Sequence, residues 1–287
     1  MITSAANARV KRIINLNKKK KLREEEGVFL VEGARMFEEV PLDKLLEVYV
    51  SESFWEKHQD AVERTLAKDV ENPRTEAKED DGFTDGIKAG GRVQVEIVKD
   101  DLFEKMCDTK TPQGVLCVVE RMRYAMDDVI GTEETPLVLI LDNLQDPGNL
   151  GTILRAGEAA GVTGILLSPA CVDLYNPKTI RSTMGAIYRV PFYYAEDEWE
   201  FKSLIAQMKE AGIFIYAAHL QGALSYDLMD YKRSCAFMIG NEGNGLREEI
   251  AALSDDYIKI PMYGEVESLN AAMAATVLAF EAARQRR

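Results

Sequence analysis

Short apolar runs alternate along the chain with segments of helical spacing, and this pattern predicts an α/β protein. Near the N-terminus the runs VFLV and LEVYV, at residues 28–31 and 46–50, enclose the helically spaced segment ARMFEEV. β-branched and aromatic residues favour strands, whereas apolar residues three and four positions apart favour a helix with one buried face. The run VQVEIV, the helical DLFEKMC and the run VLCVVE continue the alternation to residue 120.

Two polar stretches interrupt this alternation. From about residue 66 to residue 91 the sequence is acidic and contains Pro and Gly, so we interpret it as a flexible surface insertion. The second stretch, RMRYAMDDVIGTEET, has no clear strand period and ends before Pro136. The interruptions predict a smaller domain over residues 1–122, a linker over 123–135 and a second domain over 136–287.

From Pro136 onward, short apolar strands are separated by helices, which predicts a mainly parallel sheet with helices on both faces. A long helix is expected to close the chain, from about Ser268 to Arg284. Ligands of such sheets bind beyond the carboxyl ends of the strands. The informative loops are therefore those that follow the predicted strands LVLILD, IFIYAAHL, CAFMIG and YIKIP.

The composition limits the class of protein. The 287 residues are 46% hydrophobic and 29% charged, which is typical of a globular chain. We find neither a signal peptide nor an apolar stretch long enough to cross a bilayer, so we expect a cytoplasmic protein without a membrane partner. The four cysteines occur singly, and His58 and His219 are the only histidines, so we expect no metal site.

The net charge of −13 is unevenly distributed along the chain. Residues 1–23 contain basic but no acidic side chains, which leaves a net charge of −21 on the remaining residues. Basic side chains bind nucleic acid by displacing counterions from phosphates, whereas a solvated helix or tail is the simpler interpretation of a charge run alone. The eight basic residues are Arg9, Lys11, Arg12, Lys18, Lys19, Lys20, Lys21 and Arg23.

The loop after LVLILD has the sequence DNLQDPGNLG, at residues 142–151. Asp-Pro-Gly-Asn is typical of a turn, and we expect Asn149 to cap the helix whose first turns carry Arg155. An arginine near a strand end offers a planar set of donors that fits a phosphate. For this loop in isolation, a capped helix with a surface arginine is the simpler interpretation.

The loop after CAFMIG has the sequence IGNEGNGL, at residues 239–246. Its three glycines allow the backbone to approach a ligand closely. Their order, G-x-x-G-x-G, is not the dinucleotide-binding pattern, and the chain has no phosphate-binding P-loop. Glu242 lies between these glycines, where a carboxylate is costly unless it meets a donor or a cation.

The loop after YIKIP has the sequence IPMYGEVESLN, at residues 260–270. Ser268 is a reasonable N-cap for the closing helix. Asn270 is then a polar residue at the start of an otherwise apolar helix, and in isolation it is an ordinary first-turn asparagine.

These three loops, taken in order along the chain, closely resemble the three motifs of the SpoU/TrmH family of RNA ribose 2′-O-methyltransferases. The matching patterns are N-L-x-D-P-x-N-x-G-x-x-x-R-A, I-G-N-E-G-x-G-L and I-P-M-x-G-x-x-x-S-L-N-A-A. The resemblance covers about Pro136 to Arg287, and residues 176–186 also resemble the family. The N-terminal part is similar to a ribosomal-protein-like substrate-binding domain through FLVEGARM and TPQGVL.

The resemblance implies a SPOUT fold in which a trefoil knot forms near the C-terminus, a homodimer, S-adenosylmethionine as the cofactor, and RNA as the partner. Ribosomal RNA is favoured over transfer RNA by the two-domain layout. The resemblance assigns the cofactor to one set of residues, namely His219, Ile239, Gly240, Asn241, Gly243, Ile260, Met262 and Leu269. Lys178 and Arg181 join the basic residues of the N-terminus as implied RNA contacts.

The catalytic residues implied by the resemblance are Asn149, Arg155, Glu242, Ser268 and Asn270. We expect Arg155 to hold the target phosphate and to stabilise the alkoxide, because a guanidinium hardly loses its proton in proteins. Glu242 is expected to orient Arg155 through a charge-assisted pair. Methyl transfer itself requires no metal ion.

Two other classes of protein share parts of this pattern. A catalytically silent RNA-binding or assembly protein on the same fold is disfavoured by the presence of Arg155, Glu242 and Asn270. A nucleotide-dependent oxidoreductase on a doubly wound sheet is disfavoured because its glycine pattern is missing.

Overall fold

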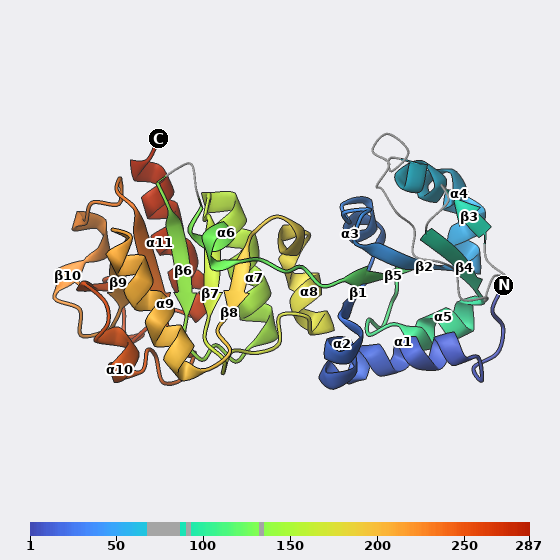
Figure 1. Ribbon diagram of the computed structural model, residues 1–287, viewed down its shortest axis with the longest axis horizontal. Helices are drawn as coiled ribbons and strands as arrows, with labels where there is room; N and C mark the ends of the chain where they lie inside the picture. The colour runs from blue at the N-terminus through green and yellow to red at the C-terminus, as the bar shows by residue number, and fades with distance from the viewer. Residues whose placement is uncertain (68–86, 90–92, 132–134) are drawn as a thin grey trace. The chain divides into compact units, whose positions relative to one another are not determined.

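The protein consists of two compact α/β units (Figure 1). Unit 1 comprises Met1–Met122 and Tyr175–Arg181, and unit 2 comprises Arg123–Leu174 and Ser182–Arg287. The structure is a computed structural model, which describes residues 1–67, 87–89, 93–131 and 135–287.

Unit 1 contains a five-stranded sheet in the order β1-β5-β2-β4-β3. Strands β2 and β4 are parallel, and the other neighbours are antiparallel. The elements in chain order are α1 (Ala8–Lys18), α2 (Lys20–Glu26), β1 (Val28–Glu32), α3 (Ala34–Glu38), β2 (Leu45–Ser51), α4 (Glu52–Ala67), β3 (Ile87–Ala89), β4 (Val93–Val98), α5 (Asp100–Met106) and β5 (Val115–Glu120).

Helix α1 belongs to the core of unit 1. Its residues Val10, Ile13 and Leu16, three positions apart, are completely buried and pack with apolar side chains of α5 and of the sheet. Three and four positions bring side chains to one helix face, so a single stripe of α1 faces the core and its basic residues take the other faces. The charged N-terminus is therefore a packed helix.

The insertion expected over residues 66–91 lies mostly outside the described residues. At its two ends the structure differs from that expectation. Helix α4 continues to Ala67, and Ile87–Ala89 forms strand β3, which pairs antiparallel with β4. The expected bounds of the insertion therefore include the end of α4, where Leu66 is buried, and strand β3.

Unit 2 contains a seven-stranded sheet in the order β10-β12-β9-β11-β6-β7-β8. Every pair of neighbouring strands in it is parallel, as the sequence predicted. The elements of unit 2 are α6 (Met126–Ile130), β6 (Leu137–Leu141), α7 (Pro147–Ala160), β7 (Gly164–Leu167), η2 (Ala186–Tyr188), β8 (Phe192–Tyr194), α9 (Glu198–Glu210), β9 (Phe214–Ala218), β10 (Leu224–Ser225), η3 (Tyr226–Leu228), β11 (Cys235–Ile239), α10 (Glu248–Ala251), β12 (Asp256–Lys259) and α11 (Ala271–Gln285). Helix α8 (Pro177–Thr183) belongs to unit 1 up to Arg181 and to unit 2 from Ser182.

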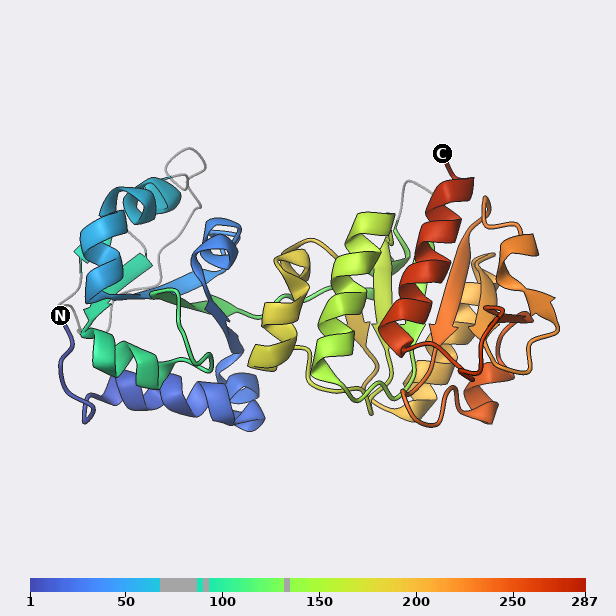
Figure 2. The same ribbon diagram turned by 180° about the vertical axis from the view of Figure 1, so that it is seen from behind.

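Helices cover both faces of this sheet. Figure 1 shows α9 in front of the sheet, and Figure 2, from behind, shows α7 and α11 side by side. Helix α9 places Phe201, Ile205 and Met208, all fully buried, against β6, β9 and β11. The central strands β6 and β11 are buried along their whole length, which explains their uninterrupted apolar sequences.

The parallel arrangement brings the carboxyl ends of β6, β9, β11 and β12 to one edge of the sheet. The loops singled out in the sequence therefore converge there. Among the described residues, no helix has the length and apolar character needed to span a membrane.

Candidate functional site

A cavity of about 600 Å³ opens at this edge of unit 2, between the loops after β9, β11 and β12 and the segment that leads into α11. Glu242 and Ser268, two of the predicted catalytic residues, are among its lining residues. All of the residues that the sequence assigned to the cofactor also line it, namely His219, Ile239, Gly240, Asn241, Gly243, Ile260, Met262 and Leu269.

The glycine-rich loop, which we define as residues 240–246, closes on itself. The N–H of Asn241 donates to the carbonyl of Gly245 (3.0 Å), and the N–H of Gly245 donates back to the carbonyl of Asn241 (2.9 Å). A Cβ on Gly240 would lie 2.1 Å from the nitrogen of Leu246 and 2.4 Å from the oxygen of Gly245. Position 240 therefore accepts only glycine without moving the far side of the loop.

Glu242 at the tip of the glycine-rich loop holds the loop that follows β6. Its carboxylate accepts hydrogen bonds from the backbone N–H groups of Gln145 (3.1 Å) and Asp146 (2.9 Å) and from Nδ2 of Asn149 (2.9 Å). Partial burial acts to raise the pKa of Glu242, but these hydrogen bonds outweigh it and leave the pKa below its usual value. Glu242 is therefore an ionised anchor.

Asn149 and Asn270 extend this contact to the loop that follows β12, residues 260–270. Oδ1 of Asn149 accepts a hydrogen bond from Nδ2 of Asn270 (3.0 Å), while Nδ2 of Asn149 donates to Glu242. A continuous chain of hydrogen bonds, which we call the Glu242 relay, joins Glu242, Asn149 and Asn270. The three motifs of the sequence thus meet through one side chain from each.

Both predicted helix caps are wrong. Asp146, not Asn149, caps α7, because its carboxylate accepts from the backbone N–H of Asn149 (2.8 Å) and Pro147 begins the helix. Asn270, not Ser268, caps α11, because its Oδ1 accepts from the N–H groups of Ala272 and Met273. These caps leave the amide of Asn149 free to join the Glu242 relay.

Arg155 is an exposed residue of α7, in the second turn beyond Asn149. It makes no hydrogen bond or ion pair with any other residue that the structure describes. The expected pair between Glu242 and Arg155 is not formed, because the oxygens of Glu242 are occupied by the loop after β6. The guanidinium of Arg155 is available to a ligand.

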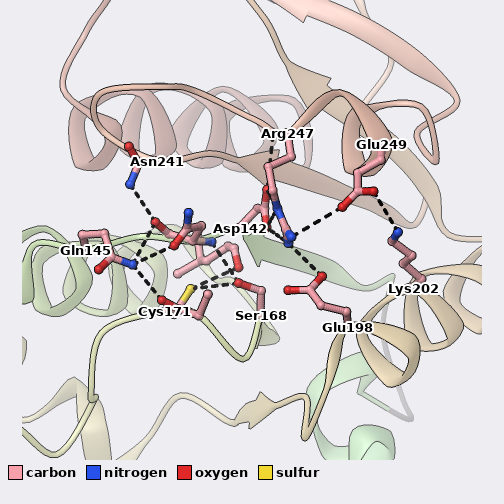
Figure 3. A network of polar contacts seen from close by, with 12 residues as sticks. Asp142, Gln145, Ser168, Cys171, Glu198, Lys202, Asn241, Arg247 and Glu249 are labelled. Carbon is pink, nitrogen blue, oxygen red and sulfur yellow. Dashed lines mark hydrogen bonds and ion pairs between the residues drawn. The ribbon is translucent and has the colours of Figure 1, made fainter.

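Asp142 and Arg247 form an ion pair that the sequence did not reveal (Figure 3). Asp142 follows β6 and is completely buried, and its two oxygens accept from Nε of Arg247 (3.1 and 3.0 Å) and from Nη2 (2.5 Å). The hydrogen bonds and charge of Asp142 raise the pKa of Arg247 above its already high value. An acidic residue directly after an apolar strand was the only signal in the sequence.

The basic residues of the N-terminus are largely neutralised within unit 1. Arg9 pairs with the buried Glu96, and Arg12 bridges Glu26 and Glu47 at 2.7 Å each. Lys20 and Lys21 pair with glutamates one helical turn away, and Nη1 of the buried Arg23 donates to the carbonyl of Leu16 (2.6 Å). Of the eight basic residues, those that are exposed and make no ion pair with the described chain are Lys11, Lys18 and Lys19.

Other residues singled out in the sequence lie away from the cavity or make ordinary contacts within one unit. Arg181 pairs with Asp108 (2.6 Å) within unit 1, and Lys178 lies exposed near the start of α8. His58 lies against Phe54, with ring centroids 4.6 Å apart. Among the described ranges, no three His, Cys, Asp or Glu side chains are arranged to hold a metal ion.

The fold and the site define a two-unit α/β protein with a cavity at the carboxyl edge of a parallel sheet. The sequence model of the SpoU rRNA Methylase family matches residues 136–280, and that of the MRM3-like substrate binding domain matches residues 7–117. The chain belongs to the SpoU rRNA Methylase family.

Some relatives match this chain over nearly its whole length. It is 30% identical to the 23S rRNA (guanosine(2553)-2′-O)-methyltransferase RlmP of Bacillus subtilis (strain 168), over 97% of each chain. The AdoMet-bound crystal structure of an rRNA methyltransferase from Sinorhizobium meliloti has a TM-score of 0.80 and 30% identity, covering 99% of this chain and 97% of the other. The AdoMet complex of AviRb from Streptomyces viridochromogenes has a TM-score of 0.78 and 26% identity, covering 98% of both chains.

Proposed function

We propose that the protein transfers a methyl group from S-adenosylmethionine to a ribose 2′-hydroxyl of RNA, with ribosomal RNA as the substrate. Family membership supports this proposal, as does the activity of the Bacillus subtilis relative, which matches this chain over nearly its whole length. The observation that carries it is the Glu242 relay at the edge of the cavity, which unites the three family motifs.

The cavity fits S-adenosylmethionine in size and in chemistry. A volume of about 600 Å³ is within the range of small-molecule sites, which are mostly apolar with a few placed polar groups. Ile239, Ile260 and Leu269 supply apolar wall, and Glu242 and Glu267 supply negative charge next to it, which suits a cationic sulfonium. When bound there, the cofactor supplies an electrophilic methyl group.

We assign the reacting groups by what each side chain is free to do. Arg155 has no partner among the described residues, so its planar set of donors can hold the phosphate beside the target ribose and stabilise the developing alkoxide. Ser268 lines the cavity and is exposed, and it can contact the substrate ribose. A guanidinium keeps its proton, so Arg155 acts through charge and position.

We assign Glu242, Asn149 and Asn270 to positioning. The amides of Asn149 and Asn270 have only one orientation that satisfies both the relay and the α11 cap, because Oδ1 of Asn270 is taken by the helix. Asn149 is thereby held at the start of the helix that carries Arg155. The relay sets the place of α7, and with it that of Arg155, relative to the cavity.

The wider organisation is also part of the proposal. We assign residues 1–122 to substrate binding, 123–135 to a linker and 136–287 to methyl transfer, with Lys178 and Arg181 among the RNA contacts. The family resemblance supports a trefoil knot and a homodimer, and the exposed apolar side chains Leu269, Met273 and Phe280 near or on α11 support a partner on that helix. A ribosomal RNA substrate supports a cytoplasmic location.

A catalytically silent RNA-binding protein is the second candidate, and the same side chains discriminate against it. A protein that only binds RNA requires neither the Glu242 relay nor an exposed arginine without partners on the helix that the relay holds. The test is a reaction of the purified protein with methyl-labelled S-adenosylmethionine and ribosomal RNA in the presence of a chelator. We expect labelled 2′-O-methylribose after nuclease digestion; labelled cofactor bound without transfer would support the silent protein.

A further inference from the structure

Loop 240–246 is attached to the end of β6 at three places. Its near side is held where Nδ2 of Asn241 donates to the carbonyl of Asn143 (2.9 Å), and its tip is held by Glu242. Its far side ends at Arg247, whose side chain holds Asp142. Figure 3 shows Asn241 and Arg247 reaching the segment after β6 from the same side.

The attachment through Arg247 is the strongest of the three in physical terms. Asp142 is fully buried, and its charge is matched by a guanidinium that contacts both of its oxygens and by the N–H of Arg247 (3.3 Å). A buried carboxylate without such a partner is strongly unfavourable. The position of Arg247 is therefore tightly coupled to the end of β6.

The loop transmits this position to the cavity wall. A Cβ at position 240 would lie only 2.1–2.4 Å from atoms of Gly245 and Leu246, so the near and far sides of the loop are in close contact. The far side cannot shift without displacing Gly240. Residues 239–246 all line the cavity, so a displacement of this loop changes the shape of the cavity.

We propose that Arg247 is a positioning residue for the methyl donor: by holding Asp142 it fixes loop 240–246 in the shape that binds S-adenosylmethionine. This inference rests on the proposed function. Glu242, at the tip of the same loop, has its own contacts to the loop after β6 and to Asn149 of α7, so the Glu242 relay has supports besides Arg247. Loosening Arg247 therefore affects cofactor affinity more than the chemical step.

The solvent end of the same network has another role. Nη2 of Arg247 also meets Glu198 at the start of α9 (3.0 Å), and Nη1 lies 3.5 Å from Glu249, which pairs with Lys202 at 3.2 Å. These partners keep the guanidinium in place when Asp142 is replaced. Asp142→Asn consequently leaves neither a buried charge nor an arginine without partners, and it is the variant best suited to fold.

The test uses Arg247→Lys and Asp142→Asn in the full-length protein. Lysine retains the charge but cannot contact both oxygens of Asp142 with a planar group. We expect the Kd and the KM for S-adenosylmethionine to rise about tenfold in Arg247→Lys and about threefold or more in Asp142→Asn, with kcat at saturating cofactor within about threefold of wild type. The matched control is Lys209→Gln, which removes the ion pair between Lys209 on α9 and Asp255, and it should behave as wild type.

Cofactor affinities within twofold of wild type in a folded variant would overturn the role of Arg247. Equal falls in kcat and affinity that follow a lower melting temperature would also overturn it, because they indicate general destabilisation. If Arg247→Lys does not fold, the affinity of Asp142→Asn decides the question. Failure of the wild type itself to bind S-adenosylmethionine would instead refute the proposed function.

Discussion

At the scale of single residues, the most specific prediction concerns the replacement of Arg155. A surface arginine without partners contributes little to the fold, so Arg155→Ala should change the free energy of unfolding by no more than about 0.5 kcal/mol. If Arg155 holds the phosphate and stabilises the alkoxide, single-turnover methylation should fall about 100-fold while cofactor affinity is unchanged. Arg155→Lys should recover little of this loss, because lysine lacks the planar set of donors.

Transfer of labelled methyl to RNA at saturating cofactor, with calorimetry in parallel, measures both effects. Arg189→Lys is the matched control, since Arg189 is exposed in unit 2 and pairs with Glu158. Normal turnover in Arg155→Ala would remove Arg155 from the mechanism.

The lowered pKa of Glu242 predicts that the stability of the protein depends on pH. Its pKa is lower in the folded protein than the usual value near 4.3, so ionised Glu242 stabilises the fold above that value. The contribution is lost as the pH falls through the lowered pKa. We therefore expect Glu242→Gln to be less stable than wild type at pH 7, with the difference shrinking towards about pH 3.

Denaturant unfolding at a series of pH values measures this difference. Glu265→Gln, an exposed glutamate of the segment before α11, serves as the control and should show little difference at any pH. A stability difference for Glu242→Gln that does not change with pH would mean that the hydrogen bonds to its carboxylate do not depend on its charge.

The roles of some single residues were predicted wrongly from local sequence patterns. Ser268 and Asn149 satisfy the local rules for helix caps, yet Asp146 and Asn270 perform that role. The partner of Asn270 in the Glu242 relay is 121 positions away, so no local pattern could reveal it. The motifs identified the right loops, but the contacts among their side chains required the fold.

At the scale of elements, the start of α11 combines a structural and a functional contact in one side chain. Asn270→Ala should cost about 1 kcal/mol of stability through loss of the cap. Asn270→Asp separates the two roles, because a carboxylate still accepts from Ala272 and Met273 but cannot donate to Asn149. We expect Asn270→Asp to retain stability within about 0.5 kcal/mol and to lose about tenfold in single-turnover rate.

Denaturant unfolding and methyl transfer, measured on both variants, test this separation. Thr276→Ala further along α11 is the control for a change in the helix away from the relay. Full activity in Asn270→Asp would show that the Asn149–Asn270 contact has no part in the reaction.

The strands were predicted well because their signal is local. Fully buried strands such as β6 and β11 have uninterrupted apolar sequences, and parallel pairing requires that kind of strand. Strand β3 was missed because it is three residues long and follows the acidic stretch. Short elements that depend on a neighbour for their hydrogen bonds leave little pattern in the sequence.

At the scale of the whole molecule, the basic residues of the N-terminus do not form a free arm in which every positive charge is unpaired. Glu96 and Glu47 lie far from α1 in the sequence but next to it in unit 1, and they neutralise Arg9 and Arg12. The sequence could not show this, because the acidic partners come from β4 and β2. The positive surface of this segment is therefore narrower than its composition suggests.

Within residues 1–23, the exposed lysines without an ion pair to the described chain are Lys11, Lys18 and Lys19, and we expect these three to contact RNA. Their joint replacement by glutamine should weaken RNA binding and lower its salt dependence by about 0.9 log units per log salt for each duplex phosphate that is no longer neutralised. Binding measured over a range of salt concentrations tests this, with the paired Lys20 and Lys21 replaced in the control. Equal effects of the two sets would contradict a specific role for the unpaired lysines.

We propose that this protein methylates a ribose of ribosomal RNA. The most direct test is ribose-methylation mapping of total RNA from a strain that lacks the gene, beside its parent and beside the deletion strain supplied with wild type or Arg155→Ala. We predict that one 2′-O-methylated position in ribosomal RNA disappears on deletion, is restored by wild type and is not restored by Arg155→Ala. Identical ribose-methylation maps for the parent and the deletion strain would contradict the claim.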